Sequence, residues 1–167
     1  MTRGYVGRPM EILLVEDNLL DARLTIKALR KAPFSHRLNL VRDGEEATQY
    51  LLRQGIFRWA PRPDLVLLDL VLPKKSGIEV LTAIRSQPEL ERAAVVVLTA
   101  NDSIEDREQC ASLHVDLIIS KPVNLTKFLK VVGDLAKHWH EDIILPFARG
   151  DAPEPDDGDT QPPQLPL

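Results

Sequence analysis

The sequence predicts an α/β fold: a doubly wound, five-stranded parallel sheet with helices on both faces. Short, nearly continuous apolar runs recur along the chain, as in strands buried on both faces. Stretches with helical period separate these runs, so that strand and helix alternate five times with short connections. Such alternation implies parallel strands with right-handed crossovers, and five strands fit the spatial order 2-1-3-4-5 most simply.

Four of the five predicted strands are short, nearly continuous apolar runs, and the second alternates between apolar and polar residues like a strand nearer an edge. In chain order they are residues 11–16, 37–41, 64–69, 93–99 and 115–120. The predicted helices are residues 19–32, 44–54, 78–86, 103–112 and 125–140. In the first helix the apolar residues share one face, which we expect to pack on the sheet. This face consists of Leu20, Leu24, Ala28 and Leu29.

Charge is unevenly distributed along the chain. From residue 146 onward five acids stand against one base, which accounts for the net charge of -4. The remaining, balanced part has no field that would attract polyphosphate, so we expect no nucleic-acid partner. No run of about 18 uncharged apolar residues occurs, and the single Cys110 fits a reducing compartment. We therefore expect a cytoplasmic protein without a membrane partner.

The chain is expected to form one domain with flanking segments. Residues 1–10 are predicted to be a disordered N-terminal segment, and residues 11–140 the folded domain. An apolar extension follows at residues 141–148. Residues 149–167 are acidic and rich in proline, which predicts a disordered tail.

Polar side chains that could bind a ligand or take part in a reaction stand at the ends of four of the predicted strands. They are Glu16 and Asp17 after the first strand, Asp69 at the end of the third, Thr99 at the end of the fourth and Lys121 after the fifth. The carboxyl ends of parallel strands meet at one edge, where doubly wound folds bind ligands. Adjacent strands lie about 4.8 Å apart, so these carboxylates should converge on one ion. Helix capping would explain Asp17 alone, but not acids at two strand ends and a lysine at a third.

Carboxylates so close together would repel one another unless a cation lay between them. Mg²⁺ is the expected occupant, because it prefers oxygen ligands and keeps positions open for phosphoryl oxygens. Asp69 is then the candidate nucleophile, which would attack a phosphoryl donor to give an aspartyl-phosphate. Thr99 can donate a hydrogen bond, and Lys121 a positive charge, to the oxygens of the transferring group.

Four motifs resemble, in order and spacing, the receiver domains of two-component response regulators. They are ILLVEDN at 12–18, LLDLVLPKKSG at 67–77, VLTA at 97–100 and SKP at 120–122. The resemblance covers residues 11–140 and implies a flavodoxin-like receiver fold that is phosphorylated by a sensor histidine kinase. It implies a phosphoacceptor and not an enzyme, with no catalytic activity other than its own phosphorylation and dephosphorylation.

The resemblance also implies a role for each residue of the site. Asp69 would be the phosphoacceptor, and Thr99 and Lys121 would contact the phosphoryl group. The Mg²⁺ ligands would be Glu16, Asp17, Asp69 and the backbone carbonyl of Val71. A phosphohydrolase or phosphotransferase would carry a second acid two residues beyond Asp69, and Val71 at that position argues against that class.

A narrower resemblance is to the small response regulators that partner phytochrome-type histidine kinases, including bacteriophytochromes. DARL at 21–24, VRDGEEA at 41–47 and the apolar run that closes the last helix carry it. It implies a receiver with a short extension and no DNA-binding output domain, which signals through protein–protein contacts.

Two features leave alternatives open. Ile118 stands where receivers usually carry Tyr or Phe, so the switch that couples Thr99 to this ring is replaced either by an aliphatic rotamer change or by another element. The missing ring also leaves open a third function, an adaptor that acts without phosphorylation.

The last helix and residues 143–147 (Ile143 to Phe147) carry more apolar surface than one helix end needs. They form either a two-fold dimer contact or a cover over their own domain.

Overall fold

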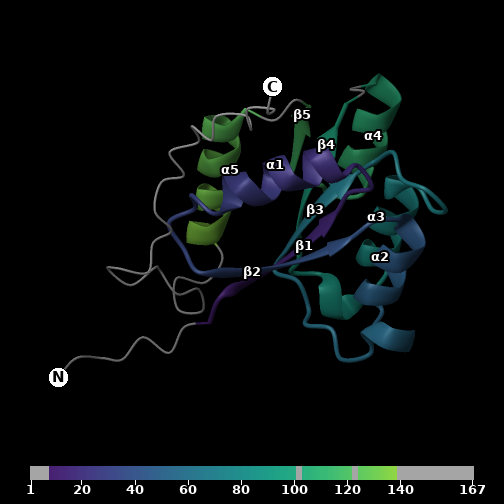
Figure 1. Ribbon diagram of the computed structural model, residues 1–167. Helices are drawn as coiled ribbons and strands as arrows, with labels where there is room; N and C mark the ends of the chain where they lie inside the picture. Colours follow the sequence, from purple (N-terminus) through teal and green to yellow (C-terminus); the bar gives the residue numbers. More distant parts are fainter. Residues whose placement is uncertain (1–7, 101–102, 122–123, 139–167) are drawn as a thin grey trace, which may run out of the picture.

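Five parallel strands and five α-helices alternate along the chain in the computed structural model, which describes residues 8–100, 103–121 and 124–138 (Figure 1). The strands are β1 (Met10–Val15), β2 (His36–Val41), β3 (Leu65–Asp69), β4 (Ala94–Thr99) and β5 (Leu117–Ser120). The helices are α1 (Leu19–Leu29), α2 (Gly44–Leu51), α3 (Gly77–Arg85), α4 (Ile104–Ser112) and α5 (Leu125–His138). The sheet order β2-β1-β3-β4-β5 confirms the predicted fold.

The differences from the expected elements are confined to their ends and to two short turns of helix. Two 3₁₀-helices that the pattern did not predict follow α2 and α3, at η1 (Gly55–Phe57) and η2 (Pro88–Leu90). The predicted extension at 141–148, the tail at 149–167 and the apolar residues 143–147 lie outside the described residues. None of the described helices is long and apolar enough to cross a membrane.

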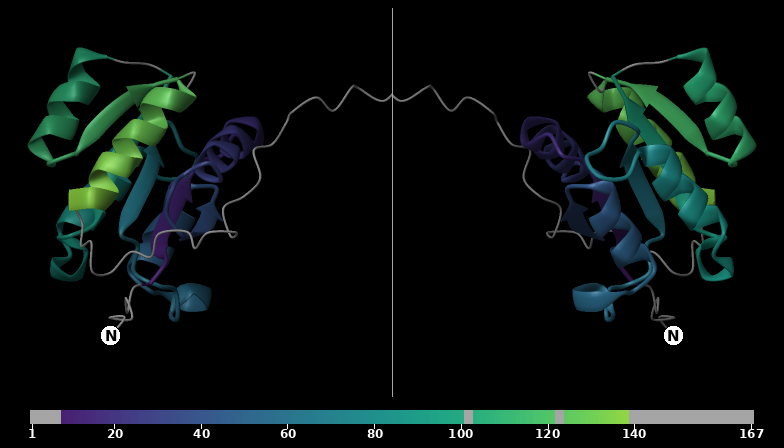
Figure 2. Two further views of the ribbon diagram at one scale, coloured as in Figure 1. Left: turned by 90° about the vertical axis from the view of Figure 1, so that its left-hand side faces the viewer. Right: turned by 90° about the vertical axis from the view of Figure 1, so that its right-hand side faces the viewer.

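Helices cover the sheet on both faces, with α1 and α5 on one and α2, α3 and α4 on the other (Figures 1 and 2). Successive residues of a strand point to opposite faces, and β1 divides accordingly. Ile12 and Leu14 join the buried cluster that contains Phe128 of α5. Leu13 and Val15 join the cluster beneath α2, α3 and α4. The two apolar layers fix the sheet from both sides and leave its ends for polar residues.

The face of α1 that packs on the sheet differs from the predicted one. Ala28 and Leu29 are buried as expected, but Leu20 and Leu24 are 68% and 57% exposed. Ala22 and Thr25 are buried in their place, so the expectation for the two leucines was wrong. Small side chains let the helix lie close to the sheet, and helical period alone does not show which of two adjoining stripes faces inward.

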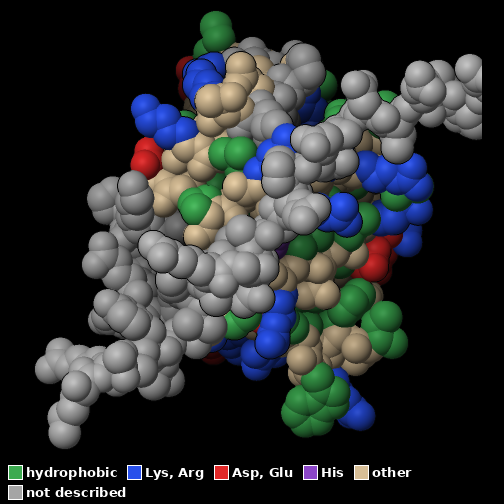
Figure 3. All heavy atoms as spheres, turned by 60° about the vertical axis from the view of Figure 1, so that its left-hand side comes forward, with side chains coloured by type: hydrophobic (Ala, Val, Ile, Leu, Met, Phe, Trp, Pro, Cys, Tyr) green, Lys and Arg blue, Asp and Glu red, His purple; other side chains and the backbone are tan. Residues whose placement is uncertain are grey.

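Other apolar side chains also reach the surface. Figure 3 shows hydrophobic and basic side chains side by side on the lower part of one face. Ile56 and Trp59, in and after η1, are 90% and 85% exposed, and the guanidinium of Arg58 lies 5.7 Å from the centre of the Trp59 ring. Exposed apolar groups therefore occur both on α1 and on the connection from α2 to β3.

The loop that follows β3 is held close to the strand end by backbone contacts. Gly77 donates its N–H to the carbonyl of Leu70 at 2.9 Å, and a Cβ at this position would overlap the backbone of Asp69 and Leu70. Ser76 caps α3 with a capping box: its hydroxyl accepts from the backbone N–H of Glu79, and the Glu79 carboxylate accepts from the backbone N–H of Ser76. These contacts hold the loop against the end of β3, where Asp69 lies.

Candidate functional site

The side chain of Lys121 lies at the centre of the polar end of the sheet. Its ammonium donates to Glu16 Oε2 at 2.6 Å, to Asp69 Oδ2 at 2.8 Å and to Asp21 Oδ2 at 3.1 Å. Only 11% of the lysine side chain is exposed. A single cation that follows β5 therefore joins carboxylates from β3, from the segment after β1 and from α1.

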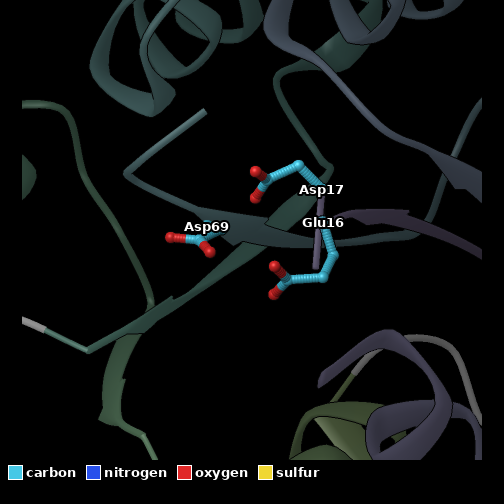
Figure 4. Close-up of side chains that lie close together, drawn as sticks. All are labelled: Glu16, Asp17 and Asp69. Atoms are coloured by element: carbon cyan, nitrogen blue, oxygen red, sulfur yellow. The ribbon is translucent and has the colours of Figure 1, made fainter. Parts of the chain in front are cut away.

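Three of the surrounding acids form a compact oxygen cluster, the acid triad of Glu16, Asp17 and Asp69. One oxygen atom from each lies within 4.8 Å of the other two. Figure 4 shows the three carboxylates converging from the adjoining ends of β1 and β3. Glu16 and Asp69 are buried, whereas Asp17 is more open to solvent. Convergent carboxylate oxygens at this spacing suit a hard divalent cation such as Mg²⁺.

Backbone groups orient two members of the triad. The N–H of Asn18 donates to Glu16 Oε1 at 3.1 Å, and the N–H of Val71 donates to Asp69 Oδ1 at 3.0 Å. Each of these carboxylates uses its other oxygen for Lys121. The orientation of both acids is therefore set by the chain itself, before any ligand binds.

The charges of the site are strongly coupled. Burial raises the pKa of Glu16, as does the charge of Asp69, while the hydrogen bond from Lys121 opposes the rise. Burial by itself would lower the pKa of Lys121, but its hydrogen bonds to Asp69, Glu16 and Asp21 prevail and raise it. Lys121 is therefore an ammonium at neutral pH. The acid triad and Asp21, as four carboxylates against one ammonium, leave a formal charge of -3 that favours binding of a cation.

Thr99 and Ile118 lie on the neighbouring strands. Thr99 ends β4, is 1% exposed, and accepts the N–H of Lys121 on its carbonyl at 2.7 Å. Ile118 pairs with Val97 in the register of β4 and β5 and is partly buried against the cluster beneath α2, α3 and α4. At the position where the resemblance to receiver domains leads us to expect Tyr or Phe, this chain therefore has an aliphatic side chain packed against the core.

The structure places the predicted residues as follows. Glu16, Asp17, Asp69 and Lys121 lie together, and Thr99 ends the adjacent strand. Val71 contributes its N–H to Asp69, and its side chain is exposed.

Asp21 was not predicted as part of the site. Asn18 caps α1 and accepts from the N–H of Asp21, which places this acid in the first turn of the helix. An acid at such a position is ordinarily explained by the helix dipole alone. The available signal was that α1 begins at the same edge of the sheet as the triad, so that an acid in its first turn can face the site.

Comparison with known proteins agrees with this geometry. The model of the response regulator receiver domain family matches residues 12–133. The chain belongs to the response regulator receiver family. A curated relative, the response regulator Rcp1 of Synechocystis sp. (strain ATCC 27184 / PCC 6803 / Kazusa), is 42% identical over 140 residues, which cover 84% of this chain and 95% of Rcp1.

Solved structures of related receivers have the same fold. The Mn²⁺-bound form of Rcp1 has a TM-score of 0.69 and 42% identity, and the match covers 83% of this chain and all of that one. The phosphorylated cyanobacterial phytochrome response regulator RcpA has a TM-score of 0.70 and 42% identity, with 84% of this receiver and 100% of RcpA covered. A divalent metal in such a relative agrees with the donor set of the acid triad.

Proposed function

We propose that this receiver accepts a phosphoryl group on Asp69 from a sensor histidine kinase and signals in that form through protein–protein contacts. The observation that carries the proposal is the ammonium of Lys121, which lies 2.8 Å from one oxygen of Asp69 and 2.6 Å from Glu16. A carboxylate held by a buried ammonium and flanked by further acids is arranged for phosphoryl chemistry rather than for structural support.

In the proposed transfer, a carboxylate oxygen of Asp69 attacks phosphorus on the phosphohistidine of the kinase. The new O–P bond forms as the P–N bond breaks, and the imidazole nitrogen leaves with the electron pair. Lys121 and Thr99 then neutralise and bind oxygens of the transferred group. The same residues catalyse uptake from small donors and slow hydrolysis, which is the extent of the catalysis that we propose.

The acid triad and the carbonyl of Val71 would hold Mg²⁺. Such an ion neutralises the charge that builds up on the phosphoryl oxygens. The oxygen atoms of Glu16, Asp17 and Asp69 fit this need because they lie close together, and Glu16 and Asp69 are buried.

We further propose that the kinase is of the phytochrome type and that the protein is cytoplasmic. RcpA, with 42% identity, is a phytochrome response regulator. The exposed Leu20 and Leu24 flank Asp21 on α1 and offer an apolar surface beside the site on which a kinase helix could pack. A dimer through the last helix and residues 143–147 stays a second, separate prediction.

The test is phosphorylation by acetyl phosphate in Mg²⁺, with the modified residue located by mass spectrometry. Asp69→Asn should abolish labelling, because the amide is not a nucleophile that forms the acyl phosphate. Asp134→Asn, a change at an exposed acid of α5, is the matched control and should be labelled like the wild type. Labelling of Asp69→Asn at the wild-type rate would contradict the proposal.

The adaptor alternative is tested with the wild-type protein and the phosphoryl mimic beryllofluoride. If phosphorylation carries the signal, beryllofluoride should change the affinity of the wild-type protein for its partner. Equal affinity with and without beryllofluoride would favour an adaptor that ignores phosphorylation.

A further inference from the structure

Asp21 contacts the central cation of the site without being part of the acid triad. Its Oδ2 accepts from the Lys121 ammonium at 3.1 Å, while the triad found among the described residues is Glu16, Asp17 and Asp69. The Asp21 side chain is 36% exposed, against 11% for that of Lys121. Asp21 is therefore the partner of Lys121 on the solvent side of the site.

The hydrogen bonds of Lys121 leave no donor in reserve. An ammonium group has three N–H donors, and Glu16, Asp69 and Asp21 each accept one. A phosphoryl oxygen on Asp69 can gain a donor from Lys121 only if one of these carboxylates gives it up. Asp21 thus competes for the same N–H groups that the phosphoryl group needs.

The charge of Asp21 acts in the same direction. Its oxygen and the Asp69 oxygen both contact one nitrogen, at 3.1 and 2.8 Å, so the two oxygens lie less than about 6 Å apart. A negative charge at this distance repels an incoming phosphoryl dianion, and it also cancels part of the field of Lys121.

We propose that Asp21 is a positioning residue that acts through Lys121 and restrains phosphoryl uptake at Asp69. The proposal rests on the proposed function, since it concerns the rate of that transfer. Asp69 forms the O–P bond as the donor's bond to phosphorus breaks, and Asp21 forms no bond to the group. Asp21 governs how much of the lysine's charge is available to the transferring oxygens.

A purely structural role for Asp21 makes different predictions. An acid in the first turn of a helix interacts favourably with the helix dipole wherever its side chain points. That role affects the stability of α1, but it gives no reason for a change in phosphorylation rate or for a dependence of the effect on Lys121.

The experiment compares full-length variants with acetyl phosphate at saturating Mg²⁺. Asp21→Asn keeps the size and an acceptor oxygen but removes the charge, and its initial rate of phosphorylation should rise on the order of 3- to 10-fold. The beryllofluoride concentration at half-saturation should fall by a similar factor. Both effects should shrink as salt is added, because the side chain is partly exposed.

Two further variants serve as rescue and control. Asp21→Glu restores the charge and should return the rate toward that of the wild type. Glu45→Gln removes an exposed acid from the first turn of α2 and should leave the rate unchanged. In a Lys121→Gln background, Asp21→Asn should change beryllofluoride binding far less, since the ammonium through which it acts is gone.

An Asp21→Asn rate equal to those of the wild type and Glu45→Gln would overturn the inference. An equal gain with and without Lys121 would also overturn it, because Asp21 would then act on the donor directly. Absence of label on Asp69 of the wild-type protein would instead overturn the proposed function. The two failures are therefore distinguishable.

Discussion

Glu16 and Lys121 are 105 residues apart in the chain, and their charged groups meet at 2.6 Å. Glu16 follows β1 and Lys121 follows β5, two strands that are separated in the sheet by β3 and β4. The two side chains meet over the end of the sheet, where the Lys121 ammonium also contacts Asp69 of β3. One contact thus closes the site and neutralises a buried carboxylate.

Replacing Lys121 by Met should destabilise the protein. The buried Glu16 and Asp69 would lose their shared cation, which should lower the free energy of unfolding by about 2–4 kcal/mol in EDTA. Urea titration would measure it, with the exposed Lys130→Met as control. Mg²⁺ should restore part of the loss, because it supplies positive charge to the same carboxylates. A loss unaffected by Mg²⁺ would contradict this explanation.

Mg²⁺ should stabilise the folded protein through Asp17. Binding to the folded state alone adds about 2.7 kcal/mol when the ion is at 100 times its Kd. Asp17→Asn should lose most of this gain while being no less stable than the wild type in EDTA, because it relieves repulsion within the triad. Thermal unfolding with and without Mg²⁺ would test it. A full Mg²⁺-dependent shift in Asp17→Asn would exclude this residue as a ligand.

Gly77→Ala should destabilise the loop that ends at the site. The added Cβ would overlap the backbone of Asp69 and Leu70, at a cost of about 1–3 kcal/mol. Gly133→Ala is the matched control: a Cβ there meets nothing within 4 Å, and alanine in a helix should stabilise by about 0.5–1 kcal/mol. Urea unfolding of both variants decides, and equal stabilities would refute the close packing at Gly77.

Cys110 should react slowly in the native protein. Its side chain is buried in α4, and burial raises the pKa of the thiol, so little thiolate exists at neutral pH to attack a reagent. Iodoacetamide followed by mass spectrometry should show labelling that is much faster in denaturing urea than in buffer. Equal rates would show that α4 exposes this thiol.

Part of the site was predictable because it depends on topology alone. Parallel strands end at one edge, so Glu16, Asp17, Asp69 and Lys121 had to meet once the strands were recognised. The position of each acid at the end of an apolar run was visible in the chain. The family match over residues 12–133 agrees with the predicted fold, and the structure brings these side chains together.

The contact of Asp21 with Lys121 was not predictable, because it depends on how α1 starts relative to β1. The cap at Asn18 and its hydrogen bond to Glu16 set the first turn of the helix. A small rotation of α1 would direct Asp21 to solvent. Sequence spacing gives no measure of that rotation.

The sequence by itself determined the α/β class, the order of the strands and the residues at the end of the sheet, because apolar runs and their polar ends are local properties of the chain. Tertiary structure alone decided that Ala22 and Thr25, rather than Leu20 and Leu24, face the sheet. It also decided that Asp21 shares the ammonium of Lys121. Helical period specifies which residues lie on one face, but the packing distance to the sheet selects the face that is buried.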